Sequence, residues 1–340
     1  MNPRIAEHAL QAYGVAYRTI LPAQKGYRNY SFAVELPDGS WQNLIIYKNE
    51  LRILKRIETA HTIGEYLHSK GLPVRHAVDA RLLKLQSTQA TRYAALYNYL
   101  PGKTIPWEAY TKNHLKLAGM TMSLMHAKLA AAKLATDSVA DEYEAIFERL
   151  QTYFADANVA RAMRQKLGIK VPPQIIERQM FILKLAQKLP HQQLLHMDFV
   201  RGNLLFRPAQ QDDSLQLNGL ALSGIIDFEK AAIGSPLFDI ARTLAFFLVD
   251  CKYKTPAQVC SYFLQSGYNK HGPAPFTNIV FRQQHHTIDM LEALTSLFLL
   301  YDFYKFLRHN PYESLQHNQH FVRTKDILLA RKMIELTKEK

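Results

Sequence analysis

Cysteine is almost absent from this chain of 340 residues, which contains only Cys251 and Cys260. Two cysteines are too few to build a disulfide framework. The N-terminal stretch MNPRIAEHALQAYGV lacks the apolar core of a signal peptide. Long apolar runs are missing as well, since the stretches 241–249 and 294–301 are too short to cross a bilayer. We therefore expect a cytoplasmic protein that makes no contact with a membrane.

Signatures of nucleic-acid binding are also missing. The chain has no arginine-rich tract, no zinc-ligand spacing and no interleaved aromatic and basic repeat. Its 42 Lys and Arg against 29 Asp and Glu give a net charge of +13, which biases the surface toward anions such as nucleotides, nucleic acid or anionic lipid. Nucleic-acid binding would predict salt-sensitive association with random duplex. Because the charges are spread out, we interpret them as a generally basic surface and expect no nucleic-acid partner.

The overall composition is that of a globular protein. Hydrophobic residues make up 48% of the chain and charged residues 21%, which excludes both a disordered and a membrane-spanning chain. A length of 340 residues exceeds the usual size of one hydrophobic core. The sequence therefore predicts two lobes or domains.

One stretch, 194–243, carries polar side chains in a chemically meaningful order. It contains His196-x-Asp198, then Asn203, and then Asp227 at the end of the apolar run 224–226. Phosphoryl transfer to a hydroxyl needs a carboxylate to accept the hydroxyl proton, an amide oxygen and a second carboxylate to hold Mg²⁺, and a cation for the nucleotide phosphates. This stretch supplies the first three groups.

The spacing places these groups on a tight loop. Residues 194–195 have the character of a strand end, and 203–206 begin another strand, so Asp198 and Asn203 lie on the loop between them. Asp198 then faces a substrate hydroxyl, while Asn203 Oδ1 and Asp227 provide oxygen ligands for Mg²⁺ held jointly by nucleotide phosphates. We expect His196 to support the loop by a hydrogen bond to its backbone near Asp227.

This pattern resembles the aminoglycoside phosphotransferase and choline kinase family, a branch of the protein-kinase-like fold. The family pattern is H-G-D-L-H-x-x-N, then D-[WF]-E and later D-hydrophobic-A. The chain departs from it at Met197, Phe199 and 200–201, and none of these departures removes a group that the chemistry requires. The matching residues are His196, Asp198, Asn203, Asp227, Phe228, Glu229, Asp239, Ile240 and Ala241.

The resemblance implies an α+β, bilobal protein-kinase-like fold with a small antiparallel β-sheet N-lobe and a mainly helical C-lobe. It implies a nucleotide-binding lobe at 1–100, a hinge near 97–102 and a helical lobe at 103–340. Within the helical lobe it implies a catalytic loop at 194–206 and a metal-binding segment at 224–243. The implied cofactors are ATP and Mg²⁺. Asp239 is expected to begin a helix, to have a structural role in bracing the loop that carries Asp198, and to pair with Arg242.

The N-terminal part offers residues for the nucleotide. The segment 22–29 joins two strand-like stretches, and its Gly26, Asn29 and Tyr30 resemble the family's phosphate-covering loop, although one glycine alone is equally typical of an ordinary β-hairpin. Trp41 to Lys48 reads as a strand, and a lysine that ends such a strand is the expected donor to the α- and β-phosphates.

The carboxylate partner of Lys48 is left open by the sequence. A helix is predicted at 53–69 and stops before the family-like G-L-P-V at 71–74. Counting back from this landmark places the family's glutamate near Ala60, so Glu58 and Glu65 are the nearest acids and we favour Glu58. A surface pair of Glu58 with Arg52 or Lys55 is an equally good interpretation.

The segment Y-L-P-G at 99–102 resembles the family's connection between lobes. Tyr97, Asn98 and Tyr99 are therefore expected near the adenine edge, with an ordinary strand exit as the alternative. Further on, helices are predicted at 110–134, 141–167, 174–189, 256–265, 278–308 and 326–335. His126 is expected to be a packed, hydrogen-bonded side chain.

The sequence thus predicts an ATP- and Mg²⁺-dependent phosphotransferase that acts on a small-molecule hydroxyl with Asp198 as the base. A catalytically silent nucleotide-binding or scaffold protein of the same fold is the alternative, favoured by the uncertain helix glutamate. The resemblance allows aminoglycosides, amino alcohols such as choline, homoserine, sugars or protein hydroxyls as acceptors. Residues 261–340 contain ten Lys and Arg against seven Asp and Glu, which disfavours a polycationic acceptor.

Overall fold

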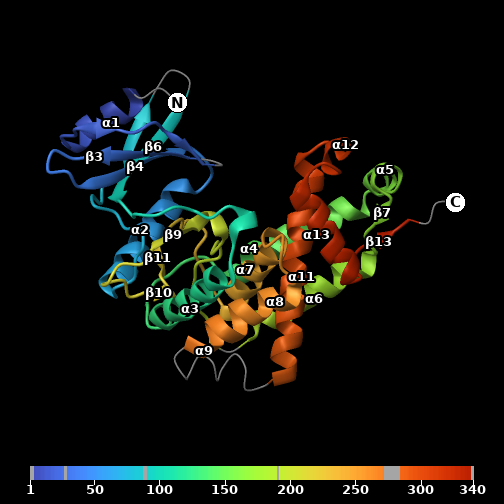
Figure 1. Ribbon diagram of the computed structural model, residues 1–340. Coiled ribbons are helices and arrows are strands. Elements are labelled where there is room, and N and C mark those ends of the chain that lie inside the picture. Colours follow the sequence, from blue (N-terminus) through green and yellow to red (C-terminus); the bar gives the residue numbers. More distant parts are fainter. Residues whose placement is uncertain (1–3, 27–28, 87–89, 190, 272–283, 338–340) are drawn as a thin grey trace. The chain divides into compact units, whose positions relative to one another are not determined.

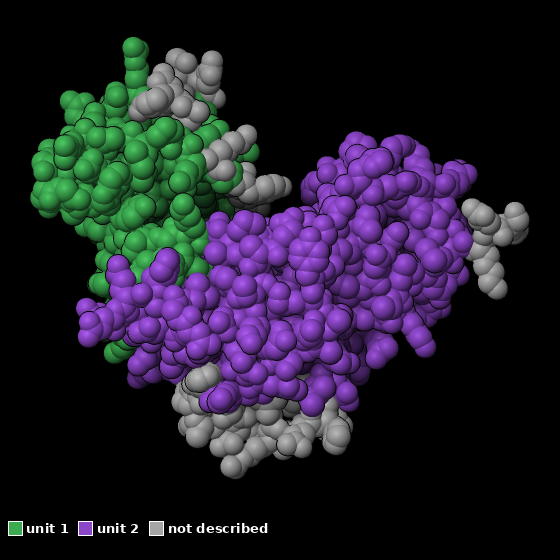
Figure 2. All heavy atoms as spheres, in the orientation of Figure 1, with its two compact units in different colours: residues 1–103, 205–207, 222–230 green, residues 104–204, 208–221, 231–340 purple. Residues whose placement is uncertain are grey.

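The computed structural model describes all residues except 1–3, 27–28, 87–89, 190, 272–283 and 338–340. The chain forms two compact units, which are coloured separately in Figure 2. Unit 1 contains residues 1–103, 205–207 and 222–230, and unit 2 contains residues 104–204, 208–221 and 231–340. Among the described residues, no helix combines the length and the apolar character needed to span a membrane.

Unit 1 is built on a six-stranded sheet, drawn in blue and cyan in Figure 1. All of its strand pairs are antiparallel, and the strand order is β1-β3-β4-β6-β5, with β2 paired to β3. The predicted strand that ends at Lys48 is present with the expected bounds. The strands are β1 (Thr19–Ile20), β2 (Gln24–Lys25), β3 (Tyr30–Glu35), β4 (Trp41–Lys48), β5 (Leu83–Gln86) and β6 (Thr91–Asn98).

The two faces of this sheet pack against different helices, because side chains alternate between the faces along each strand. Helix α1 (Arg4–Tyr13) covers one face, and helix α2 (Ile53–Ser69) contributes Ile57 to the cluster on the other. The α1 cluster includes Leu10, Phe32, Val34, Leu44, Ile46, Ala94 and Leu96. The α2 cluster contains Ile45, Tyr47, Ile57, Ala95 and Tyr97.

Two segments from much later in the chain complete unit 1. Val74 forms a parallel bridge with Ile225, at the end of β11 (Leu220–Ile225), and Lys103 forms an antiparallel bridge with Phe206 in β9 (Leu204–Pro208). Strand β11 lies between β9 and β10 (Gln216–Leu217) in a three-stranded sheet. The segment that carries Asp227 therefore belongs to unit 1, whereas the sequence had placed all residues after 102 in the second lobe.

Unit 2 is mainly helical. Helix α7 is its central element, since every residue of this helix except Phe246 is buried, and it packs against α11 and α13. A helix that is buried on all sides belongs in the interior of a bundle. The helices are α3 (Lys112–Leu129), α4 (Val139–Ala155), α5 (Ala157–Leu167), α6 (Pro173–Gln187), α7 (Pro236–Asp250), α8 (Pro256–Cys260), α9 (Asn269–His271), α11 (Gln284–His309), α12 (Tyr312–Leu315) and α13 (Gln319–Ala330), with a π-helical segment at Ser261–Tyr268.

Short strand pairs connect parts of unit 2. Strand β8 (Gln193–Leu195) pairs with β12 (Ala232–Gly234), and β7 (Ile169–Lys170) pairs with β13 (Glu335–Leu336). All of these pairs are antiparallel. The first pair holds the residues that enter the predicted catalytic loop.

Several predicted helices differ in extent from those observed. The helix expected at 110–134 ends at Leu129, the one expected at 256–265 becomes π-helical after Cys260, and residues 278–283 of the helix expected at 278–308 lie outside the described residues.

In two other cases the reason for the difference is clear. The helix expected at 141–167 is divided at Asp156, whose side chain accepts hydrogen bonds from the backbone N–H groups of Asn158 and Val159 and so begins α5. The last helix runs from Gln319 to Ala330 rather than over 326–335, because Asn318 caps its start and Glu335 lies in β13. In both cases a capping side chain decided the boundary.

A close approach of α3 to the π-helical segment generates a stability prediction. A Cβ atom on Gly119 would overlap the carbonyl oxygen of Phe263 and lie 2.7 Å from the backbone nitrogen of Tyr268. We expect Gly119→Ala to lower the free energy of unfolding by about 1–3 kcal/mol, although alanine is the better helix former. Urea denaturation measures this change.

The matched control for this prediction is Gly202→Ala, since a Cβ there meets nothing within 4 Å. We expect the control to change the free energy of unfolding by less than about 0.5 kcal/mol. If Gly119→Ala were as stable as the control, the close packing between α3 and the π-helical segment would be refuted.

Candidate active site

The predicted catalytic loop lies in unit 2 between two strands, as the spacing indicated. Strand β8 ends at Leu195, a 3₁₀ turn spans Arg201–Asn203, and β9 begins at Leu204. Within this loop the Nδ2 group of Asn203 donates to the carbonyl oxygen of Asp198 at 2.9 Å and to its Oδ2 at 3.2 Å. The structure thus brings Asp198 and Asn203 together, and it leaves Oδ1 of Asn203 as the atom suited to a metal ion.

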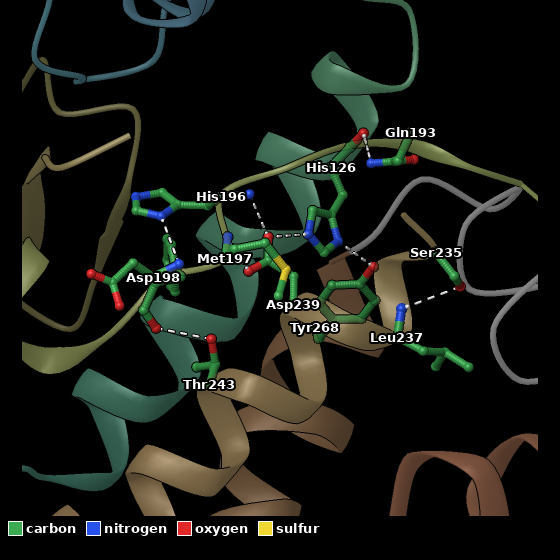
Figure 3. A network of polar contacts seen from close by, with 11 residues as sticks. His126, Gln193, His196, Met197, Asp198, Ser235, Leu237, Asp239, Thr243 and Tyr268 are labelled. Atoms are coloured by element: carbon green, nitrogen blue, oxygen red, sulfur yellow. Dashed lines mark hydrogen bonds and ion pairs between the residues drawn. The ribbon is translucent and has the colours of Figure 1, made fainter. Parts of the chain in front are cut away.

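The start of the loop is fixed by the buried carboxylate of Asp239 in α7 (Figure 3). Its Oδ2 accepts from the backbone N–H of His196 at 2.8 Å, and its Oδ1 accepts from that of Met197 at 2.9 Å. Met197 has a φ of 59°, in the left-handed region that favours glycine. This backbone conformation explains why the family pattern has glycine at the position of Met197.

A histidine from α3 completes the surroundings of Asp239. Nε2 of His126 lies 3.1 Å from Asp239 Oδ2, its Nδ1 lies 2.9 Å from the Tyr268 hydroxyl, and both His126 and Asp239 are fully buried. Burial by itself would raise the pKa of Asp239, but the hydrogen bond and charge of His126, with the N–H of His196, outweigh it and lower that pKa. His126 is therefore a packed, hydrogen-bonded side chain, as expected.

Two expectations about α7 were wrong. The side chain that caps the helix belongs to Ser235, which accepts from the backbone N–H of Leu237, and Asp239 lies within the first turn. Arg242 does not pair with Asp239 but forms a bidentate ion pair with Asp302 of α11, at 2.9 and 3.2 Å. The ion pair with Asp302 frees Asp239 for the backbone of the catalytic loop.

The remaining loop contacts fix its other side. Nδ1 of His196 accepts from the backbone N–H of Asp198 at 3.2 Å, so His196 supports the loop from within. The carbonyl oxygen of Phe199 accepts from the Thr243 hydroxyl at 2.9 Å. Nε of Arg201 donates to Asp250 at 3.0 Å. Sequence reasoning missed Arg201 and Thr243, whose partners are more than forty residues away.

The predicted metal-binding segment lies in unit 1. Asp227 follows β11 with a φ of 71°, a left-handed conformation that aspartate tolerates better than most residues and that turns the chain at the strand end. Two residues later, Oε1 of Glu229 accepts from the Tyr47 hydroxyl at 2.8 Å. Burial and the neighbouring charge of Asp227 raise the pKa of Glu229 well above its usual range. The carboxylate of Asp227 is an oxygen ligand of the kind that suits a divalent cation.

A chain of hydrogen bonds leads from Glu229 across the α2 face of the sheet. The hydroxyls of Tyr47 and Tyr97 lie 2.7 Å apart, and Nε2 of His61, in α2, lies 2.8 Å from the Tyr97 hydroxyl. The sequence indicated Glu229 only as part of the D-F-E match and Tyr97 only as a residue of the expected connection between lobes. Tyr47 and His61 carried no signal beyond ordinary strand and helix patterning.

Lys48 and Glu58 are not brought together. Both side chains are exposed, and neither makes an ion pair with another described residue. Strand alternation places Lys48 on the side of Leu44 and Ile46, which face α1. At the end of β4, the side chain that faces the α2 cluster is that of Tyr47.

The hairpin residues and the hinge residues form mainly structural contacts. The N–H of Gly26 donates to the carbonyl oxygen of Asn29 at 2.9 Å, and Asn29 Oδ1 accepts from the backbone N–H of Lys48 at 3.4 Å. The side-chain amide of Asn98 bonds the backbone of Val74 and His76. Tyr99 is 41% exposed and contacts Trp41, so its backbone remains the more suitable partner for an adenine edge.

The buried charge of Asp239 generates a pH-dependent prediction. Because its folded-state pKa is lowered, this group stabilises the fold above its unfolded pKa of about 3.9, and the contribution is lost as the pH falls through the folded-state value. Asp239→Asn removes the charge and turns an amide N–H₂ toward backbone donors. We expect it to cost about 3 kcal/mol at pH 7.

Urea denaturation of the wild type and Asp239→Asn between pH 7 and pH 3 measures this effect, and the difference should shrink below about pH 4. The isosteric control is Asp326→Asn, whose side chain is 62% exposed. Equal losses in the two variants at pH 7 would show that Asp239 does not hold the loop.

Comparisons with known proteins identify a matching family and similar folds. A family model described as the phosphotransferase enzyme family matches residues 19–252. No curated protein sequence matches the chain significantly. A microcompartment-associated aminopropanol kinase has a similar structure, with a TM-score of 0.66, 13% identity and coverage of 99% of this chain and 100% of that one.

Other solved structures are similar to a comparable degree. The amicoumacin kinase hAmiN, solved with AMP-PNP, Ca²⁺ and Ami, has a TM-score of 0.64 at 14% identity, with 96% of each chain covered. A GDP and kanamycin complex of an APH(2″) enzyme has a TM-score of 0.58 at 14% identity, covering 97% of this chain and 99% of that one. The fold is therefore the predicted α+β, protein-kinase-like one. Because the family model matches well over half of the sequence, the chain belongs to the phosphotransferase enzyme family.

Proposed function

We propose that this protein transfers the γ-phosphate of ATP, in the presence of Mg²⁺, to a hydroxyl group of a small molecule. The observation that carries the proposal is the hydrogen bond of Asn203 to Asp198, on a loop whose backbone is held by the buried Asp239. A fixed carboxylate beside an amide is the arrangement that phosphoryl transfer to a hydroxyl requires. The family match to residues 19–252 supports the same reaction class.

Each polar group of the loop has a role in this proposal. Asp198 orients the acceptor hydroxyl and takes its proton as the oxygen attacks the γ-phosphorus and the bond to the ADP oxygen breaks. His196, Asp239 and Arg201 keep the loop backbone in place, so that little reorganisation is needed during the reaction. Positioning and charge neutralisation therefore account for most of the catalysis.

The metal site is proposed from the chemistry of its donors. Asn203 keeps its Oδ1 available because Nδ2 is used for Asp198, and Asp227 presents a carboxylate beside Glu229. Oxygen donors of this kind fit Mg²⁺, which proteins bind with few carboxylates together with nucleotide phosphates. Bound Mg²⁺ neutralises charge on the β- and γ-phosphates. The AMP-PNP and Ca²⁺ reported for the amicoumacin kinase support a nucleotide with a divalent cation.

For the rest of the nucleotide site, we propose that the backbone at Gly26 and Asn29 covers the phosphates. The backbone near Asn98 and Tyr99 binds the adenine edge, since the Asn98 side chain is already used. Lys48, at the end of β4, and Glu58, in α2, were the sequence's choice for the phosphate-binding pair. Both side chains are exposed, and they do not form that pair.

The acceptor remains a broad class in this proposal. The proteins of similar structure include an amicoumacin kinase, an aminopropanol kinase and an APH(2″) enzyme solved with kanamycin. In this chain Asp302 of α11 is neutralised by Arg242 and by Lys305, whose Nζ lies 2.5 Å away. This pairing agrees with the basic character of 261–340 and favours amino alcohols or sugars over polycationic acceptors.

A catalytically silent nucleotide-binding protein is the second candidate function. The separation of Lys48 from Glu58 favours it, since active kinases require a positioned lysine and glutamate pair. An ADP-release assay across amino alcohols, sugars and aminoglycosides, beside calorimetric ATP binding, separates the two functions. ATP binding without release of ADP for any acceptor would support the silent protein.

Asp198→Ala tests the base. We expect it to lower kcat by at least about 10²-fold, because the hydroxyl proton loses its acceptor, while ATP affinity changes by less than about 3-fold. ADP release and calorimetry measure the two quantities, with Asp326→Ala as the exposed control. Turnover at the wild-type rate would rule out Asp198 as the base.

Asp227→Ala tests the metal-binding carboxylate. We expect ATP binding in the presence of Mg²⁺ to weaken by at least about 10-fold and to become insensitive to Mg²⁺, because a charged ligand of the ion is lost. Calorimetric titrations with and without Mg²⁺ provide the measurement. A Mg²⁺ dependence equal to that of the wild type would contradict the assignment.

A further inference from the structure

The α2 face of the unit 1 sheet lacks the charged pair that a kinase of this fold uses for phosphate binding. Such a pair joins a strand lysine to a glutamate on the helix that packs against the sheet, so both side chains must lie on that face. Here the end of β4 presents Tyr47 to this face, and α2 presents His61. Lys48 projects to the other side, in line with Ile46.

Neutral groups fill the place of the pair. Tyr47 is fully buried and donates to Glu229, and its hydroxyl lies 2.7 Å from that of Tyr97, which in turn lies 2.8 Å from Nε2 of His61. Because Tyr47 is held by Glu229, it fixes the segment that carries Asp227. Hydroxyl groups do not neutralise phosphate charge, so this network leaves the need for a cation unmet.

Arg75 is the cation associated with this network. Its guanidinium carbon lies 5.6 Å from the centre of the Tyr97 ring. The Tyr97 hydroxyl lies 2.7 Å from that of Tyr47, which donates to Glu229 at 2.8 Å. Arg75 therefore lies beside the hydrogen-bonded chain that ends at the carboxyl group of Glu229.

The backbone of Arg75 is fixed from two sides. Its N–H donates to the carbonyl oxygen of Ile225 at 2.9 Å, beside the bridge between Val74 and Ile225. On the other side α2 approaches so closely at Gly64 that a Cβ there would overlap the carbonyl oxygen of Arg75. A planar guanidinium on such a rigid support has the fork geometry that binds two phosphate oxygens at once.

We propose that Arg75, rather than Lys48, supplies the positive charge that binds the nucleotide phosphates, while Tyr47 and Tyr97 take the place of the lysine and glutamate pair and hold Glu229. This inference deepens the proposed function and rests on its nucleotide substrate. It makes Arg75 a nucleotide-binding residue on the segment that follows α2.

Calorimetric binding of ATP with Mg²⁺ and of adenosine to the full-length protein tests the proposal. In Arg75→Met, affinity for ATP should fall about 10- to 100-fold, the loss expected for charge-assisted hydrogen bonds, while adenosine affinity changes by less than about 2-fold. Arg75→Lys should recover part of the loss, because it restores the charge without the fork.

Arg92→Met is the matched control. Its guanidinium also covers a tyrosine ring, at 5.8 Å from the centre of Tyr30, but strand alternation places it on the α1 side of the sheet, in line with Ala94 and Leu96. Arg92→Met and Lys48→Met should each keep ATP affinity within about 3-fold of the wild type.

Several outcomes would overturn the inference. Loss of ATP affinity in Lys48→Met with little change in Arg75→Met would restore the strand lysine to its usual role. Equal loss of ATP and adenosine in Arg75→Met would show a merely structural arginine. Unchanged or tighter ATP binding in Arg75→Met would show that Arg75 only neutralises Glu229, and a wild type that binds no nucleotide would overturn the inference and the proposed function together.

Failure of the inference can be told apart from failure of the proposed function. If no acceptor is phosphorylated but Arg75→Met selectively loses ATP affinity, the inference stands and phosphoryl transfer falls. If an acceptor is phosphorylated and Arg75→Met has the same KM for ATP as the wild type, the proposed function stands and the inference about Arg75 fails.

Discussion

The buried carboxylate of Asp239 is the interaction on which the candidate active site depends. It accepts hydrogen bonds from two backbone N–H groups of the proposed catalytic loop and contacts His126 from α3, so one side chain links the loop, α7 and α3. A buried charge is costly unless every lone pair has a partner. Here that requirement constrains the loop, because moving the backbone of His196 and Met197, next to Asp198, would leave Asp239 without its donors.

The same principle shapes the surroundings of Asp239. Arg242, three residues further along α7, is itself buried and needs a counter-charge, which it finds in Asp302 of α11. If Arg242 paired with Asp239, the backbone N–H groups of His196 and Met197 would lose their acceptor. Separate partners for the two buried charges therefore permit the catalytic loop and the helix packing of unit 2 to coexist.

In unit 1, neutral side chains hold the carboxyl group of Glu229. Glu229 is held by a tyrosine hydroxyl, and that hydroxyl is followed by a second tyrosine and a histidine. A lysine and glutamate pair would bring two charges to the same face and require an exact balance between them. The tyrosine network avoids that requirement, and it leaves the charge of Arg75 to act on Glu229 and Tyr47.

By itself, the sequence determined the family, the fold class and the loop that carries Asp198 and Asn203, because these follow from local spacing between strand ends and from a pattern of fixed offsets. It also determined strand β4 and helix α2 with their bounds, since β4 is a continuous apolar run that follows a turn and α2 has Ile and Leu at helical spacing. Only the tertiary structure decided the partners of Arg242, Arg201 and Tyr47, each of which lies more than forty residues away. Hydrogen bonds and ion pairs over such distances depend on which side chains the packed helices and strands bring to one place, and periodicity within a single element does not contain that information.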